Sequence, residues 1–425
     1  MASHRIAPEN TEERLIHLAL AGGWVWYALG ALYVVGPLLG ISLLGMVLWR
    51  RYAAGWSPGV VAPNAIPAGV WAWIVGMMAM LIALWMGHLN EELSAAQTLK
   101  STIGWLKGWA LLAIFPMAGA CLRIRPELVI RSFGVFALQT LVLIPFLVLA
   151  ALAHLPPKLF VSPLQILGGP GPEFFSVYLY IVDPSNGASR WQFIAPWAPA
   201  AGMLGNLIFV LASFETDRRY RMIGLLTGLL MCFMTKSRMA MLFLIVFPCL
   251  LWTMSRLSRP RMLAAGAASA VVIGVLADIV ITTIQDGIAA FRGARADSTR
   301  VREALGRIAI DRWWDEAVIW GHGIVERGPH FVEYMPIGSH HTWYGLLYVK
   351  GLVGALALAL PLLWSIVEML LLSQVSWLGR VALSFCLMLV FYSFGENLEI
   401  LSYLFWPGLI VLGIALRPVD EGARV

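Results

Sequence analysis

The chain has 425 residues, of which 60% are hydrophobic and only 13% are charged, and its formal net charge is +6. Its mean hydropathy of +0.78 is too high for a water-soluble domain. Apolar runs of about 20 residues, the length that crosses a bilayer as an α-helix, recur along the chain. The sequence therefore predicts an all-α polytopic membrane protein.

The basic residues lie in short clusters between the runs and do not indicate a nucleic-acid partner. The cysteines lie inside apolar runs, which argues against a disulfide framework or a thiolate metal site; they are Cys121, Cys232, Cys249 and Cys386.

The apolar runs predict about twelve transmembrane helices. The first run, 15–49, is too long for one span at about 1.5 Å per residue, and Gly36-Pro37 predicts a turn that divides it into two helices. A polar stretch of fourteen residues precedes this run, so we expect an uncleaved membrane anchor. The other predicted spans are 69–87, 103–121, 132–153, 193–213, 222–234, 239–254, 262–284, 342–370, 381–394 and 400–416.

These spans divide the chain into three parts. Residues 1–284 are predicted to form a membrane bundle of about nine spans, and 342–425 a C-terminal bundle of about three spans. Between them, 285–341 form a large polar segment that carries four of the eight histidines. Apolar residues at near-helical spacing predict an amphipathic helix over 300–319, lying on the membrane surface or on the bundle.

The arginines and lysines of the connections predict the orientation. With the N-terminus in the cytoplasm, the inner connections and termini hold sixteen arginines. The short outer connections hold only five basic residues, which are Lys100, Lys158, Arg190, Lys236 and Arg238. We therefore expect the segment 285–341 to lie on the side of the membrane opposite the cytoplasm.

The turn Thr235-Lys236-Ser237-Arg238 joins two short apolar segments on this outer side. The planar fork of an arginine matches phosphate oxygens in pairs, and Arg238 also begins a helix whose free N–H groups favour an anion. The pattern is therefore compatible with a diphosphate site at the membrane surface. The alternative is that Lys236 and Arg238 reach lipid headgroups, as basic residues flanking a span commonly do.

His341 stands at the start of the span 342–370, where the helix dipole and nearby arginines disfavour a charged imidazolium. A neutral imidazole at the membrane surface suits a general base near neutral pH. The alternative is an interfacial belt in which His341 lies beside the anchoring Trp343 and Tyr344. The neighbouring His340 would point about 100° away on a helix, so the pair is a poor metal site. No glycine loop of the GxxxxGK[ST] type indicates ATP binding.

Several short motifs occur in the order and spacing of one family. They are Thr235-Lys236-Ser237-Arg238, Arg300 followed by Trp313 or Trp314, Gly321-His322-Gly323, His341-Thr342-Trp343-Tyr344-Gly345-Leu346-Leu347 and Gly351-Leu352-Val353-Gly354. Together they cover about a third of the chain, which resembles the O-antigen ligase and polymerase superfamily of bacterial surface-polysaccharide assembly. That family commonly has Asn after this histidine, whereas this chain has Thr342.

The resemblance implies a metal-independent, inverting glycosyltransferase of C-type fold that needs no cofactor. Its donor would be a glycan on undecaprenyl diphosphate at the periplasmic face, and its acceptor a saccharide. By motif, Arg190, Arg238 and Arg300 would bind the diphosphate, and His341 would deprotonate or orient the acceptor hydroxyl. Candidates to support them on the same predicted side are Lys236, Ser237, His340, His322 and Glu396.

Three functions are compatible with this pattern. A polymerase of O-antigen, capsule or exopolysaccharide joins repeat units, whereas an O-antigen ligase moves the finished glycan to a lipid A core. From another class, a flippase or transporter of lipid-linked oligosaccharides would carry charges at the bilayer midplane and often repeated halves. Here the ionisable residues gather at one face, with Lys350 the main exception. We therefore expect a glycosyltransferase, of the polymerase type before the ligase type.

Overall fold

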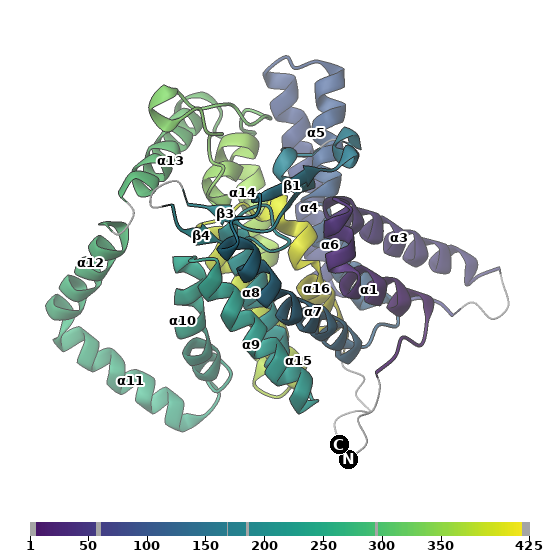
Figure 1. Ribbon diagram of the computed structural model, residues 1–425. Helices are drawn as coiled ribbons and strands as arrows, with labels where there is room; N and C mark the ends of the chain where they lie inside the picture. Colours follow the sequence, from purple (N-terminus) through teal and green to yellow (C-terminus); the bar gives the residue numbers. More distant parts are fainter. Residues whose placement is uncertain (1–5, 57–60, 168, 184–186, 294–295, 419–425) are drawn as a thin grey trace.

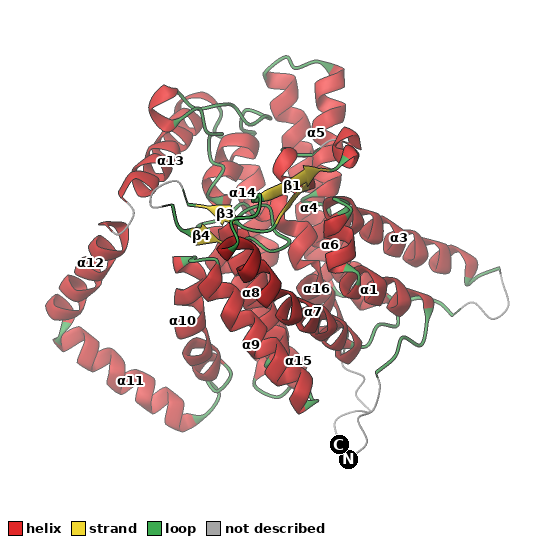
Figure 2. Cartoon of the chain, viewed as in Figure 1, coloured by secondary structure: helices red, strands yellow, loops and turns green. Residues whose placement is uncertain are grey.

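The computed structural model describes residues 6–56, 61–167, 169–183, 187–293 and 296–418; of residues 167, 284, 288–292 and 296–299 only the backbone is described. The described chain is almost entirely helical, with two short hairpins at one end (Figures 1 and 2). Its α-helices are α1 (Thr11–Ala21), α2 (Gly23–Ala28), α3 (Leu32–Ala53), α4 (Ala68–Asn90), α5 (Ala95–Lys107), α6 (Leu111–Cys121), α7 (Pro126–Leu152), α8 (Ala198–Ala212), α9 (Arg218–Met234), α10 (Arg238–Met254), α11 (Pro260–Val275), α12 (Ala277–Gly293), α13 (Ala296–Glu316), α14 (Thr342–Ser373), α15 (Trp377–Ser393) and α16 (Leu398–Ala415).

The lengths and composition of these helices confirm the polytopic membrane class. Among the described residues, six helical segments are long and apolar enough to cross a membrane: α3, α4, α5 with α6, α7, α14 and α16. The helices α8, α10 and α15 are apolar but shorter, and α11 with α12 passes the same test as a pair bent by 84°. The predicted total of twelve spans stays a prediction.

The predicted turn at Gly36-Pro37 is wrong, because both residues lie inside α3. The chain instead breaks at Gly30, whose φ of +65° favours glycine. A Cβ at Gly30 would also lie 2.2 Å from the Cβ of Ser162. Pro37 is tolerated because neighbouring groups in a membrane bundle can satisfy a freed carbonyl.

Glycines let the central helices approach each other closely. α16 is buried on nearly all sides and packs against α6, while α14 packs against α4. A Cβ at Gly413 of α16 would lie 2.0 Å from the carbonyl oxygen of Pro116, and one at Gly119 of α6 would lie 2.3 Å from that of Ile410. Such backbone-to-backbone contact is typical of helix packing in membranes, where small residues line the interface.

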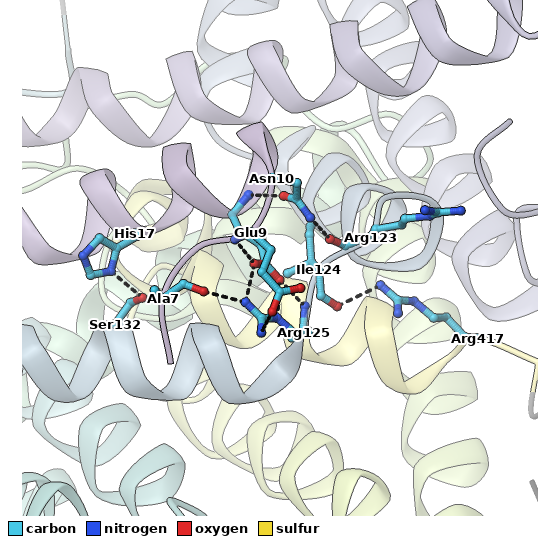
Figure 3. A network of polar contacts seen from close by, with 10 residues as sticks. Ala7, Glu9, Asn10, His17, Arg123, Ile124, Arg125, Ser132 and Arg417 are labelled. Carbon is cyan, nitrogen blue, oxygen red and sulfur yellow. Dashed lines mark hydrogen bonds and ion pairs between the residues drawn. The ribbon is translucent and has the colours of Figure 1, made fainter. Parts of the chain in front are cut away.

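One end of the bundle gathers connections that the sequence assigns to the cytoplasm. The Nδ2 of Asn10 donates to the carbonyl oxygen of Arg123 at 2.7 Å, and Arg125 binds the carboxylate of Glu13 at 2.7 Å (Figure 3). From the other end of the chain, Arg417 donates to the carbonyl oxygen of Ile124 at 3.2 Å. Three distant segments of the sequence thus meet at the same end.

The opposite end carries the two hairpins and the polar segment. β1 (Lys158–Val161) pairs antiparallel with β2 (Ser176–Tyr178), and β3 (Ile181–Val182) pairs antiparallel with β4 (Ser189–Arg190). In the second hairpin Ile181 lies opposite Arg190. The strand β4, which contains Arg190, lies near the ends of α8 and α10 (Figure 1).

The polar segment is docked onto a kink in α14. Gly351 has φ +59° and ψ −161°, so the helix ladder is interrupted there. The loop after α13 fills the gap: the N–H of His322 donates to the carbonyl oxygen of Tyr348 at 2.9 Å, and the N–H of Leu352 donates to that of Val318 at 2.9 Å. The predicted amphipathic helix is α13. It packs on α14 through a face that includes Ala309, and its Leu305 packs against Val332 of the polar segment.

The predicted span 262–284 is not one straight helix. It corresponds to most of α11 and the first half of α12; these two helices bend by 84° and form an arm that stands away from the bundle between α10 and α13 (Figure 1). No residue of α11 is buried. This arm links α10 of the membrane bundle to α13.

The orientation can be tested at the two ends of α14, which are about 48 Å apart for 32 residues. Val325 and Val375 are both exposed, the first in the polar segment and the second beyond the other end of α14. In a cysteine-free background, we expect Val325→Cys to react with an impermeant thiol reagent in spheroplasts, and Val375→Cys to react only after lysis. The reverse pattern would contradict the predicted orientation.

Candidate active site

A cavity of about 1080 Å³ opens at the end of the bundle that carries the two hairpins. Its wall is formed by β4, the turn between α9 and α10, α13, the start of α14 and the turn before α16. The polar and aromatic side chains that line it include Arg190, Lys236, Ser237, Arg238, Arg302, Glu303, Arg307, Asp311, His340, His341, Tyr344 and Glu396. The cavity thus brings together seven of the nine residues predicted for the site, and Arg300 and His322 do not line it.

Arg190 ties the second hairpin to the end of α9. Its Nε and Nη2 donate to the carbonyl oxygen of Thr235 at 3.1 and 3.0 Å, and its Nη1 donates to the Oδ2 of Asp183 at 3.3 Å. The Asp183 carboxylate is nearly buried. Much of the donor capacity of Arg190 is therefore committed to the protein, and this side chain holds the turn that follows Thr235.

The turn itself has an unusual backbone. Lys236 has φ +50°, a left-handed conformation that costs a residue other than glycine on the order of 1 kcal/mol or more. Ser237 then caps α10, because its Oγ accepts from the N–H of Ala240 at 3.3 Å. Arg238 is the first residue of α10, as the sequence predicted. The exposed Lys236 and the half-buried Arg238 therefore lie beside the positive end of a 17-residue helix.

His341 caps α14. Its Nδ1 accepts a hydrogen bond from the N–H of Tyr344 at 3.3 Å, and its ring stacks on that of Tyr344 with centroids 3.9 Å apart. A backbone N–H can only donate, so Nδ1 carries no proton and the neutral ring holds its proton on Nε2. The edge of Phe394 closes another side of the ring at 5.7 Å.

Burial keeps both histidines of the pair neutral. It lowers the pKa of His341 to about 4, and together with the charge of Arg302 it lowers the pKa of His340 to about 4. The lowered pKa of His341 agrees with the neutral imidazole that the sequence predicts, with burial as its cause.

Glu396 is a buried carboxyl group that follows His341 in the sequence, whereas the arginines of α13 precede His341. Glu396 nevertheless lines the same cavity as these arginines. Its Oε2 accepts from the Nε1 of Trp197 at 2.9 Å. The hydroxyl of Thr342 donates to its backbone carbonyl oxygen at 2.7 Å, which fixes the turn against the start of α14. Burial raises the pKa of Glu396 to about 7, although the hydrogen bond from Trp197 and the charge of Arg302 oppose this.

Two arginines that the sequence reasoning missed line the cavity from α13. Arg302 and Arg307 are among its lining residues, whereas Arg300, which is exposed as they are, does not line it. Residues two apart on a helix are separated by about 200°, so Arg300 and Arg302 face different ways. The buried stripe of α13, in which Leu305 lies in a cluster with Val332 and Ala309 lies in one with Val349 of α14, is the signal that could have identified the arginines beside it.

His322 lies outside the cavity, where it fastens the polar segment to α14. Its Nε2 is 2.7 Å from the Oε2 of Glu316, its Nδ1 is 3.0 Å from the carbonyl oxygen of Tyr348, and its ring stacks on that of Tyr348 at 4.4 Å. The bonds from Arg312 and His322 lower the pKa of Glu316. In the part of the chain that the structure describes, no group of three His, Cys, Asp or Glu residues is placed to hold a metal ion.

The fold and the cavity together define a polytopic membrane protein with an arginine- and histidine-lined site at one end of its bundle. A family model described as O-Antigen ligase matches residues 223–359, from α9 to the middle of α14. Residues 223–359 are therefore similar to the O-antigen ligase family, in agreement with the resemblance that the sequence motifs carry. The matched range includes Arg238 and His341 but neither Arg190 nor Glu396. A comparison with curated proteins found no match.

The role of Arg190 in holding the turn can be tested by stability. Arg190→Met removes charge-assisted hydrogen bonds, including the one to the Asp183 carboxylate, each worth about 1.5–3 kcal/mol. We expect a lower midpoint of thermal unfolding in detergent. Because part of the cost is the buried charge, the double variant with Asp183→Asn should recover part of the loss. A midpoint equal to that of the wild type would contradict this role.

Proposed function

We propose that this protein is a membrane glycosyltransferase that transfers a glycan from undecaprenyl diphosphate to a sugar hydroxyl and thereby polymerises repeat units of a surface polysaccharide. The observation that supports the proposal most is the division of the cavity wall. Lys236, Arg238, Arg302 and Arg307 supply cations on one part, and His341 and Glu396 supply uncharged or weakly acidic groups on another.

The cationic part suits a diphosphate. Arg238 offers a planar fork, and the N-terminus of α10 adds backbone N–H groups that favour an anion. When the glycosidic bond to the diphosphate breaks, negative charge grows on the leaving group. Fixed cations in a partly desolvated cavity stabilise that charge without reorganising.

The part of the cavity wall that carries His341 and Glu396 suits the acceptor. His341 is neutral and carries a proton on Nε2, so it can orient a sugar oxygen, and a proton-accepting group near it would complete the transfer. The glycosyl diphosphate supplies the driving force, so no nucleotide is needed. The site would face the periplasm of an inner membrane, where lipid-linked glycans are presented.

Ligation of a finished glycan to a lipid A core is the second candidate, which the description of the matching family model favours. Incubation of the purified protein with a lipid-diphosphate-linked repeat unit, with and without lipid A core, separates the two. We expect a ladder of polymer without the core acceptor, and the same rate in EDTA. Products that appear only with lipid A core would favour ligation, and loss of activity in EDTA with rescue by zinc would contradict metal independence.

The contributions of the arginines to donor binding can be compared by substitutions that keep the positive charge. Arg238→Lys and Arg302→Lys lose the paired contact with phosphate, so we expect use of the lipid-diphosphate donor to fall roughly 10- to 150-fold, or about 1.5–3 kcal/mol. Arg300, which the resemblance favours, is the matched comparison on the same helix. A larger effect of Arg300→Lys than of Arg302→Lys would mean that the motif, and not the cavity, identifies the arginine of α13 that binds the donor.

A further inference from the structure

Glu396 has the position of a reacting group rather than of a structural ion pair. It is 2% exposed, it lines the cavity, and none of the salt bridges among the described residues includes it. Its Oε2 is held by Trp197 at 2.9 Å, while its Oε1 accepts no hydrogen bond from the described residues. One carboxyl oxygen is thus fixed, and the other remains available to a substrate.

The hydrogen bonding of His341 argues against the simplest role for that histidine. Nδ1 is occupied by the N–H of Tyr344, and in the neutral ring Nε2 carries the proton. Neither nitrogen can then take a proton unless the cap of α14 breaks. The imidazole can still donate a hydrogen bond through Nε2.

We propose that Glu396 takes the proton of the acceptor hydroxyl, and that His341 is a positioning residue that donates from Nε2 to a substrate oxygen. This assignment rests on the proposed glycosyl transfer. Thr342 links the two groups, because its hydroxyl donates to the carbonyl oxygen of Glu396 at 2.7 Å and accepts from the N–H of Leu398 at 3.1 Å.

The step is balanced without a cofactor. The acceptor O–H bond breaks as its proton moves to the Glu396 carboxylate, and the acceptor oxygen forms a bond to the anomeric carbon of the donor. The bond between that carbon and the diphosphate oxygen breaks, and the lipid diphosphate leaves with the electron pair. The protonated Glu396 then releases its proton to water.

The surrounding charges are mixed, so the carboxyl group can titrate near neutral pH. Trp197 on α8 contributes no charge, and the two histidines are neutral. The ionisable groups on the elements around Glu396 are Arg190, Lys236, Arg238, Arg302, Glu303, Arg307, Asp311, His340, His341 and Glu399. With its pKa raised to about 7, Glu396 is deprotonated above pH 7 and gains a proton as the pH falls through 7.

The pH dependence therefore separates the two candidate bases. A base at Glu396 loses activity as the pH falls through about 7, whereas a base at His341 would stay active until about pH 4. The profile of kcat/KM should show an acid limb near pH 7 in the wild type and in His341→Gln. The limb should be absent from the residual activity of Glu396→Gln.

The variants are chosen to keep the fold. Glu396→Gln retains an oxygen that can accept from Trp197, so the turn can stay in place while the carboxylate is lost. Glu399→Gln is the matched control, because Glu399 is a half-buried carboxyl three residues away that does not line the cavity. Binding of undecaprenyl diphosphate, measured separately from transfer, reports whether the cationic part is intact.

We expect Glu396→Gln to bind undecaprenyl diphosphate within about threefold of wild type and to transfer glycan about 10²- to 10⁴-fold more slowly, with Glu399→Gln unchanged. Transfer by Glu396→Gln at the wild-type rate, an acid limb near pH 4, or an unchanged limb in Glu396→Gln would overturn the assignment. If the wild type neither binds undecaprenyl diphosphate nor transfers glycan from it, the proposed function itself fails.

Discussion

The hydroxyl of Thr342 is the contact on which the arrangement of the cavity depends. It is buried at the first residue of α14, and it joins this helix to the turn before α16 by donating to Glu396 and accepting from Leu398. A buried hydroxyl left without these partners would cost about 1–3 kcal/mol. The family that the chain resembles commonly has Asn at this place. An Asn amide also offers one donor and one acceptor, so Thr342 can supply the same kind of link with a shorter side chain.

The positions of Lys236 and Arg238 depend on the backbone conformation of the turn before α10. The left-handed conformation of Lys236 is unfavourable by itself, and it persists because Arg190 binds the carbonyl oxygen of Thr235 on one side and Ser237 caps α10 on the other. The position of Arg238 at the start of α10 follows from that cap. These interactions within the protein fix the geometry of the turn before a substrate binds, so binding requires less reorganisation.

The sequence predicted the helical membrane class and the helix α13, because both follow from local hydropathy and capping patterns. It also predicted Arg238 and His341 on one side of the membrane, and the structure has both in one cavity at one end of the bundle. It could not predict the break at Gly30, since that depends on Ser162, which is distant in the chain. The kink at Gly351 likewise depends on the loop around His322. The face of α13 that meets the cavity is set by packing against α14, and it presents Arg302, whereas the motif predicts Arg300.

The separation of charge within the cavity has a consequence for the proposed reaction. A charged imidazole beside Arg302 would add to the cations already present, and the burial that keeps His340 and His341 neutral avoids this repulsion. As the acceptor proton reaches Glu396, one negative charge is neutralised on that part of the wall while another develops on the diphosphate beside Arg238. The total charge in the cavity stays constant as negative charge moves from the carboxylate towards the cations. In a partly desolvated site an uncompensated charge is costly in free energy. A step that leaves the total charge unchanged therefore costs less free energy than one that creates a new uncompensated charge.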